Sequence, residues 1–196
     1  GYIITGSTKS YGAGNYDVYL IKTDGNGEEQ WSRTFGGTSD DIGLSVQQTT
    51  DGGYIITGWT DSFGVEDNDI YLIKTDGNGI EQWSQTFGGS DPDVGSSVQQ
   101  TTDGGYIITG QTGLFNDNWT DVYLIKTDEN GIEQWSNTFG GTEQENGYSV
   151  QQTTDEGYII SATTDSFGVG DSDVYLIKTD GNGIEQWSQT FGGTGI

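Results

Sequence analysis

The sequence predicts an all-β protein, a β-propeller built of 52-residue, four-stranded blades. Three observations lead to this fold class: a repeat of fixed period, strand-like runs between turn signals, and no segment with the apolar period of a helix. The peptide Gly-Tyr-Ile-Ile begins at residues 1, 53, 105 and 157. The same step separates three further sets of residues, without insertion or deletion: Lys22, Lys74, Lys126 and Lys178; Trp31, Trp83, Trp135 and Trp187; and Phe35, Phe87, Phe139 and Phe191.

Each period contains four strand-like runs. In the copy from Ser45 they read Ser-Val-Gln-Gln-Thr, Tyr-Ile-Ile-Thr-Gly, Asp-Ile-Tyr-Leu-Ile-Lys and Glu-Gln-Trp-Ser-Gln-Thr-Phe. Asp-Gly and Asn-Gly turns between runs supply the positive φ angles of tight hairpins. The third run is apolar on both faces, as in a strand buried on both sides, and the first is small and polar, as in a strand lining a narrow channel. Radial four-stranded sheets are favoured over a β-solenoid, whose coils are shorter.

The domain organisation follows from the same repeat. We expect one β-propeller domain or propeller segment over residues 1–196, with copies at 1–52, 53–104, 105–156 and 157–196. Inner-strand runs begin at Ser45, Ser97 and Ser149, so the first blade is predicted to lack its inner strand. An unpaired edge at Tyr2 to Thr5 would then be free to pair with another chain. Two outcomes are open: a compact four-bladed ring that tolerates a three-stranded blade, or a segment whose ring is completed by further repeats or by a second copy. The second is favoured, so we expect association of copies or a longer native chain.

Composition excludes several classes of function. The chain has no Cys and no His, which excludes disulfides, thiol nucleophiles, Ser-His-Asp catalysis and imidazole-bound zinc. A net charge of −24 disfavours nucleic acid and anionic lipid as partners, and no run approaches the roughly 20 apolar residues of a membrane span, so no direct membrane insertion is expected. Paired carboxylates can hydrolyse glycosides, but no acidic pair stands apart from the repeat. No enzyme is expected.

The repeat also resembles a known family. The pattern Tyr-Ile-Ile-Thr-Gly, Asp-Val-Tyr-Leu-Ile-Lys, Gly, Trp, Phe-Gly-Gly, Asp and Ser-Val covers the whole chain and resembles the SBBP-type beta-propeller repeats of bacteria and archaea, which occur in secreted and surface-layer proteins. The similarity to kelch repeats is looser. The resemblance implies an extracellular or cell-surface scaffold, adhesion or assembly role. It implies other copies or adjoining repeats as partners, and it carries over no catalytic residue.

Candidate ligand-binding residues lie where the copies differ, since the blade does not dictate those positions. Trp59 and Trp119 break the repeat in stretches predicted to be loops. They could contact a surface glycan or a protein partner, or could cap a neighbouring blade. Tyr11 is kept as a third ligand candidate. Its position is aromatic in every copy, which favours a packing role: Tyr11, Phe63, Phe115 and Phe167. Asn118 opens the sequon Asn-Trp-Thr, a possible glycosylation site.

Carboxylates suggest a possible Ca²⁺ site. Six follow the Phe-Gly-Gly turns: Asp40, Asp41, Asp91, Asp93, Glu143 and Glu145. Hard oxygen ligands suit Ca²⁺, although no spacing matches an EF-hand, and solvated charge with turn hydrogen bonds is the alternative. Four constant aspartates are expected to bond the backbone in every blade: Asp17, Asp69, Asp121 and Asp173. The four recurring tryptophans are predicted to be core residues.

Overall fold

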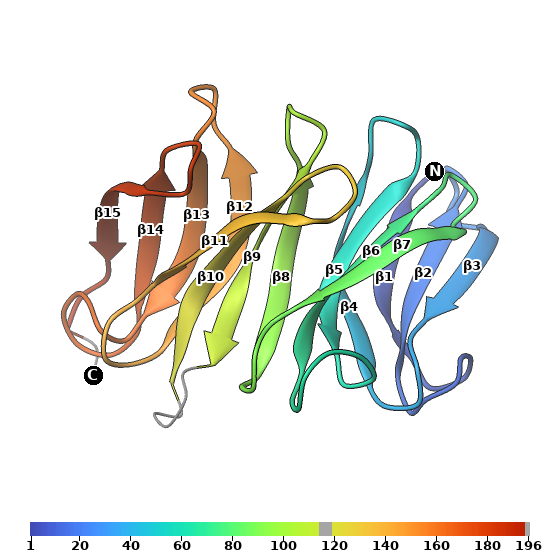
Figure 1. The fold of residues 1–196 in the computed structure, drawn as a ribbon, viewed down its shortest axis with the longest axis horizontal. Helices are drawn as coiled ribbons and strands as arrows, with labels where there is room; N and C mark the ends of the chain where they lie inside the picture. The colour runs from blue at the N-terminus through green and yellow to red at the C-terminus, as the bar shows by residue number, and fades with distance from the viewer. Residues whose placement is uncertain (114–118, 195–196) are drawn as a thin grey trace.

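The computed structural model describes residues 1–113 and 119–194. In this part of the chain every regular element is a β-strand, and the strands form four antiparallel sheets. Figure 1 shows the sheets side by side along the long axis of the molecule. Within the same residues no helix is long and apolar enough to cross a membrane.

Each sheet corresponds to one predicted blade. Blade 1 has three strands and blades 2, 3 and 4 have four, so the prediction that blade 1 lacks an inner strand is confirmed. The strands are β1 (Ile3–Thr8), β2 (Asp17–Thr23) and β3 (Glu29–Phe35) in blade 1; β4 (Asp41–Gln48), β5 (Tyr54–Thr60), β6 (Asp69–Thr75) and β7 (Glu81–Phe87) in blade 2; β8 (Asp93–Gln100), β9 (Tyr106–Gly113), β10 (Thr120–Thr127) and β11 (Glu133–Phe139) in blade 3; and β12 (Glu145–Gln152), β13 (Tyr158–Thr164), β14 (Asp173–Thr179) and β15 (Glu185–Phe191) in blade 4.

Within each blade the strands are ordered as in the sequence. Each four-stranded blade begins one strand before the 52-residue sequence copy that supplies its other three strands. Strands β4, β8 and β12 each come from the end of one sequence copy and pair with the first strand of the next. The three are also neighbours across blades. Glutamine side chains link them: the Gln100 amide donates to Gln47 Oε1 (2.6 Å), and the Gln152 amide donates to Gln99 Oε1 (2.7 Å). These are the inner strands that the sequence predicts.

The core lies between blades rather than within one. Along β6, Ile70 and Leu72 pack toward blade 3, whereas Tyr71 and Ile73 pack toward blade 1. All four side chains are buried, as expected of a strand that is apolar on both faces. Because period-2 alternation sends neighbouring side chains to opposite faces, each middle strand contributes to two interfaces at once.

The blades form an open series. Blade 1 (blue) and blade 4 (red) lie at opposite ends of the molecule in Figure 1. The propeller-like, four-copy arrangement predicted from the sequence is confirmed, and each end of the series leaves one sheet face without a neighbouring blade.

Candidate functional site

Three equivalent interfaces join neighbouring blades, and each is centred on an aromatic pair. The rings of Trp31 and Tyr54 have centroids 5.9 Å apart in an edge-to-face arrangement. The pairs Trp83–Tyr106 and Trp135–Tyr158 repeat this contact at 5.8 Å. Edge-to-face pairs at this spacing are favourable for aromatic rings.

A turn glycine of the following blade closes over each tryptophan. A side-chain carbon added at Gly79 would lie 2.6 Å from the Trp31 ring, and one added at Gly131 would lie 2.6 Å from the Trp83 ring. Both glycines have positive φ angles of 74° and 78°. Only glycine combines this backbone conformation with such a close approach.

The sheet face of blade 4 that points away from blade 3 has the same residues, but no following blade covers it. Trp187 is 44% exposed, and Val174 is 51% exposed although its counterpart Val122 is fully buried. Phe191 is likewise exposed, whereas Phe139 is buried. The prediction that all four recurring tryptophans are core residues is therefore wrong for Trp187, because burial of this position requires a following blade. Its three counterparts are half-buried and pack against the interblade clusters.

Blade 1 presents the opposite half of the same interface. Tyr2 is 62% exposed, while its counterpart Tyr54 is 2% exposed against Trp31. Ile4 is exposed as well, and a side-chain carbon at Gly27 would meet nothing within 4 Å. The two ends of the series thus carry the two complementary halves of the contact that the interior makes three times.

The predicted calcium ligands divide into two groups. Asp41, Asp93 and Glu145 are buried and accept hydrogen bonds from the turn amides of Gly37, Gly89 and Gly141 at 2.8, 2.9 and 2.8 Å. Asp41 also accepts from Thr60 Oγ1 and Ser62 Oγ, and Glu145 accepts from Thr164 Oγ1 at 2.6 Å. These three carboxylates tie the Phe-Gly-Gly turn to the start of an inner strand.

The other three acidic residues point elsewhere. Asp40 accepts from the Tyr16 amide (3.2 Å), Asp91 is half-buried beside Ser90, and Glu143 is exposed. In the described ranges, no three carboxylates come close enough together to hold a metal ion. Calcium binding by these residues stays a prediction.

Buried carboxylates meet in pairs beside the first glycine of the Phe-Gly-Gly turns. A carbon added at Gly88 would overlap a carboxylate oxygen of both Asp69 and Asp93. Burial raises the pKa of Asp93, and the charge of Asp69 raises it further. Burial also raises the pKa of Asp121, with a further contribution from Glu145. Burial and the neighbouring carboxylate thus both disfavour the charged forms of Asp93 and Asp121.

The constant aspartates perform the predicted backbone task where the structure describes their partners. Asp17 accepts from the amides of Ala13 and Gly14, Asp69 accepts from Val65 (2.6 Å), and Asp173 accepts from Val169 (2.8 Å). These bonds fold the variable loop back onto the strand that follows it. The segment that would correspond before Asp121 lies outside the described residues.

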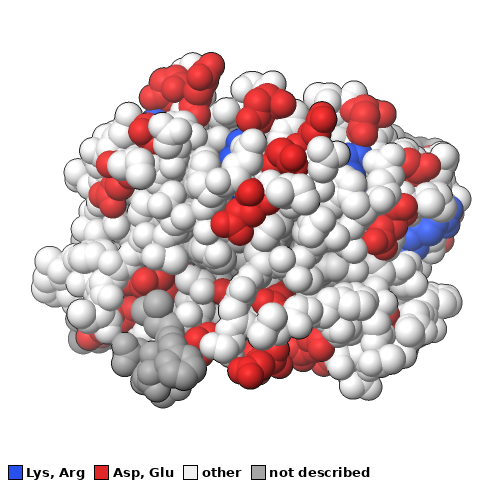
Figure 2. All heavy atoms as spheres, viewed as in Figure 1, with Lys and Arg blue, Asp and Glu red and all other residues white. Residues whose placement is uncertain are grey.

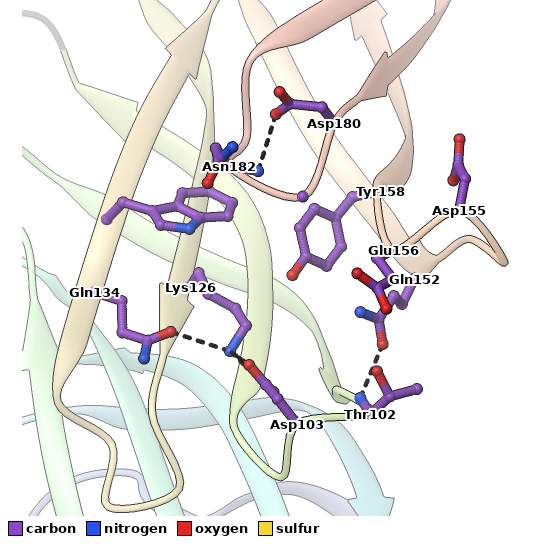
Figure 3. A pocket seen from close by; sticks show the side chains of 12 residues that line it. Thr102, Asp103, Lys126, Gln134, Gln152, Asp155, Glu156, Tyr158, Asp180 and Asn182 are labelled. Atoms are coloured by element: carbon purple, nitrogen blue, oxygen red, sulfur yellow. Dashed lines mark hydrogen bonds and ion pairs between the residues drawn. The ribbon is translucent and has the colours of Figure 1, made fainter.

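A polar crevice opens between blades 3 and 4, on the edge that carries the β8–β9, β10–β11, β12–β13 and β14–β15 turns (Figure 3). It has a volume of about 810 Å³. Buried Lys126 lies at its centre and donates to the Thr127 carbonyl, Asp103 and Gln134 at 2.8, 3.2 and 3.3 Å. The Lys74–Asp51 and Lys178–Asp155 ion pairs repeat the arrangement at 2.8 and 3.0 Å. Lys126 is thus satisfied by its own blade and holds two turns together.

Glu156 in this crevice departs from the repeat. It has a φ of 66°, and its counterparts Gly52 and Gly104 have φ angles of 84° and 89°. A non-glycine residue in this region carries strain. Nothing in the structure explains why glutamate stands here.

The predicted ligand residues do not form one site. Trp59 lies within strand β5 and is half-buried, so its predicted place on a loop is wrong. Trp119 is 41% exposed just before β10, and Tyr11 is exposed on the loop between β1 and β2. Asn118, with Phe115 and Asp117, lies outside the described residues.

Tyr11 lines a pocket that recurs in blades 2 and 4 and that the sequence analysis does not predict; these three cavities are called the rim pockets below. It packs on Tyr19 with ring centroids 5.9 Å apart and lines a cavity of about 340 Å³ with Ser32 and Thr34. Cavities of about 260 and 250 Å³ recur beside the Phe63–Tyr71 and Phe167–Tyr175 pairs. The shared aromatic position and the Ser-x-Thr of the outer strand were the available signals.

On the side of the molecule drawn in Figure 2, Asp and Glu gather mainly along the two edges where the loops and turns lie.

Comparison with known proteins assigns no family to the chain. No protein-family model and no curated protein sequence matches the chain. Among solved structures, the chain is similar to a protein of unknown function from Bacteroides caccae, with 11% sequence identity and a TM-score of 0.46. The similarity covers 89% of this chain and 78% of that one.

Proposed function

We propose that this chain is a non-catalytic structural or assembly module of a secreted or cell-surface protein, and that it assembles by packing blade on blade. One observation carries the proposal: the exposed face of blade 4 and the exposed face of blade 1 are the two halves of the interblade contact. The occupant of each face is then the opposite end of a second copy.

Complementarity supports this choice of occupant. Trp187 lacks the tyrosine and the turn glycine that cover Trp135, and blade 1 offers both as Tyr2 and Gly27. An exposed apolar face of this kind marks an interaction surface. The contact is head-to-tail, so it propagates or closes into a ring according to the rotation between copies.

The chemistry of the buried polar groups supports a structural role. The charged groups of Lys126 and Asp41 form hydrogen bonds that join turns and strands within the fold. The resemblance to SBBP-type repeats is the basis for the extracellular or cell-surface location in the proposal.

Light scattering and sedimentation of the 196-residue protein test the proposal. We expect mass to rise with concentration, and we expect Trp187→Asp to abolish the rise because it places a charge in the apolar contact. Leu44→Ser is the matched control, since Leu44 is 48% exposed on strand β4 of blade 2, which is not an end blade. A wild-type protein that stays monomeric at all concentrations would contradict the assembly role.

A second candidate is carbohydrate or protein binding, favoured by the three equivalent rim pockets. Each pairs a partly exposed aromatic ring with serine and threonine side chains, a combination that suits a sugar ring. Saturable binding in a glycan screen, lost in Phe63→Ala and Phe167→Ala but kept in Leu44→Ser, would support this role. No binding would remove it.

A further inference from the structure

Strand β1 has a free edge at the place where every other blade has an inner strand. In blade 2, β4 pairs with β5 from Asp41 opposite Thr60 to Gln48 opposite Tyr54. The equivalent positions on β1 run from Thr8 back to Tyr2, and β1 pairs with β2 alone. An unpaired row of backbone amides and carbonyls can accept another strand.

The space beside Gly6 is open, whereas an inner strand fills the corresponding space in blades 2 and 3. The inner strand of blade 2 shifts register between Gly43 and Ser45. As a result, a side-chain carbon at Gly58 would overlap the carbonyl oxygen of Ile42, whereas one at Gly6 would meet nothing within 4 Å. In blade 4 the equivalent residue is Ala162, so the paired arrangement tolerates one methyl group.

A receptor for the leading acidic residue of the strand is also in place. In blade 2, Thr60 Oγ1 and Ser62 Oγ donate to Asp41, while the Ser62 amide donates to Thr60 Oγ1 at 3.0 Å. Blade 1 keeps the last of these bonds, from the Ser10 amide to Thr8 Oγ1 at 3.1 Å. Both hydroxyls therefore occur where a carboxylate would arrive.

The glutamine ladder ends at the same place. The Gln100 and Gln152 backbone amides each donate a hydrogen bond to the preceding inner strand, to the side-chain oxygens of Gln47 and Gln99. Gln48 is the equivalent residue of β4, and blade 1 has no inner strand to supply such an oxygen. A strand docked on β1 would continue the ladder.

We infer that the free edge of β1 is a docking edge for an extended peptide with the pattern acidic residue-x-Gly-x-Ser-Val-Gln-Gln. The occupant is an inner strand of this repeat type carried by a second polypeptide, and it adds antiparallel to β1 by main-chain hydrogen bonds. Docking uses the edge of blade 1, whereas end-to-end packing uses the sheet face of blade 1 that points away from blade 2. The two can therefore succeed or fail independently.

The test uses a synthetic peptide with the sequence of residues 41–48 and the 196-residue protein carrying Trp187→Asp, which separates docking from association. Calorimetric titration is expected to show saturable binding, with a rise in melting temperature because the peptide binds the native state. Gly6→Val is expected to lower the affinity at least tenfold, since a branched side chain would meet the peptide carbonyl. Gly89→Val is the matched control, because a carbon there also meets nothing within 4 Å.

Two altered peptides complete the test. Replacing the leading aspartate by alanine is expected to weaken binding about tenfold, in line with the loss of hydrogen bonds to a charged group. A scrambled peptide of the same composition is expected not to bind. Equal binding of the scrambled peptide, equal affinity of Gly6→Val and Gly89→Val, or no binding of the original peptide would each overturn the proposal.

Discussion

Trp135 and Trp187 are the same residue of the repeat in two different surroundings. Trp135 is covered by Tyr158 of the next blade, and Trp187 is 44% exposed because blade 4 has no neighbour on that side. Their local sequences, Glu-Gln-Trp-Ser, are identical. The comparison teaches that burial in this molecule is a property of the interface between blades, since a single blade cannot cover its own apolar face.

The largest expected effect comes from removing a covered tryptophan. Trp83→Ala should lower the free energy of unfolding by about 3 kcal/mol, because it leaves a cavity against Tyr106. Trp187→Ala should cost less than about 1 kcal/mol in monomeric protein, since its ring is largely in water. Denaturant titration at low protein concentration measures both; equal losses would break the comparison.

The next effect separates an interior lysine from its blade 1 counterpart. Lys126→Met should cost about 1–3 kcal/mol, because it removes hydrogen bonds to Thr127, Asp103 and Gln134. In the described part of the chain, blade 1 has no inner strand and hence no turn equivalent to the β8–β9 turn that carries Asp103, so Lys22→Met should cost less than about 0.5 kcal/mol. Thermal unfolding of the two variants checks the order, and a larger loss at Lys22 would contradict it.

A smaller effect is expected from pH. The raised pKa values of Asp93 and Asp121 favour the protonated folded state, so their contribution is complete below about pH 4 and is lost as pH rises through their folded-state pKa values. The Lys74 hydrogen bond lowers the pKa of Asp51 to about 2, and that contribution is lost as pH falls from about 4 toward 2.

Stability should therefore rise as pH falls through the folded-state pKa values of Asp93 and Asp121, and it should fall again as pH drops from about 4 toward 2. Asp93→Asn should flatten the rise between pH 7 and 4, because it removes one ionisable member of a buried pair. Melting temperatures across this range measure the effect. If the melting temperature of the wild-type protein falls steadily as pH is lowered from 7, the buried carboxylate pairs do not dominate the pH dependence of stability.

The smallest effect is expected from calcium. If Asp40, Asp91 and Glu143 supply ligands, millimolar Ca²⁺ should raise the melting temperature relative to chelator by mass action. Asp91→Asn should remove part of this calcium-dependent rise in melting temperature. Equal melting in both solutions would remove calcium from the account.

Much of the fold could be predicted because the same turn and strand signals recur in each copy of the repeat. The Asp-Gly and Asn-Gly turns, the doubly apolar run from Asp69 and the polar run from Ser45 identify strand positions and their order from inside to outside. The three-stranded blade 1 follows from where the polar runs occur.

The site was less predictable because its properties depend on neighbours in space. Sequence identity hides the exposure of Trp187, and the identity of Tyr2 does not reveal that it faces solvent. Trp59 looked like a loop residue because its counterparts vary, yet β5 continues through it. Asp69 and Asp93 lie in one sequence copy but in two different blades, so their contact depends on how blades 2 and 3 pack together and not on their spacing along the chain.

Mixing two single variants tests the central claim, that the end faces repeat the interior contact, most directly. Trp187→Asp disables one face and leaves Tyr2 intact, whereas Tyr2→Asp disables the other and leaves Trp187 intact. Each variant alone should sediment as a monomer, and the mixture should form heterodimers that grow no further, because each copy retains one working face. A mixture that stays monomeric, or a single variant that still associates, would contradict the head-to-tail contact.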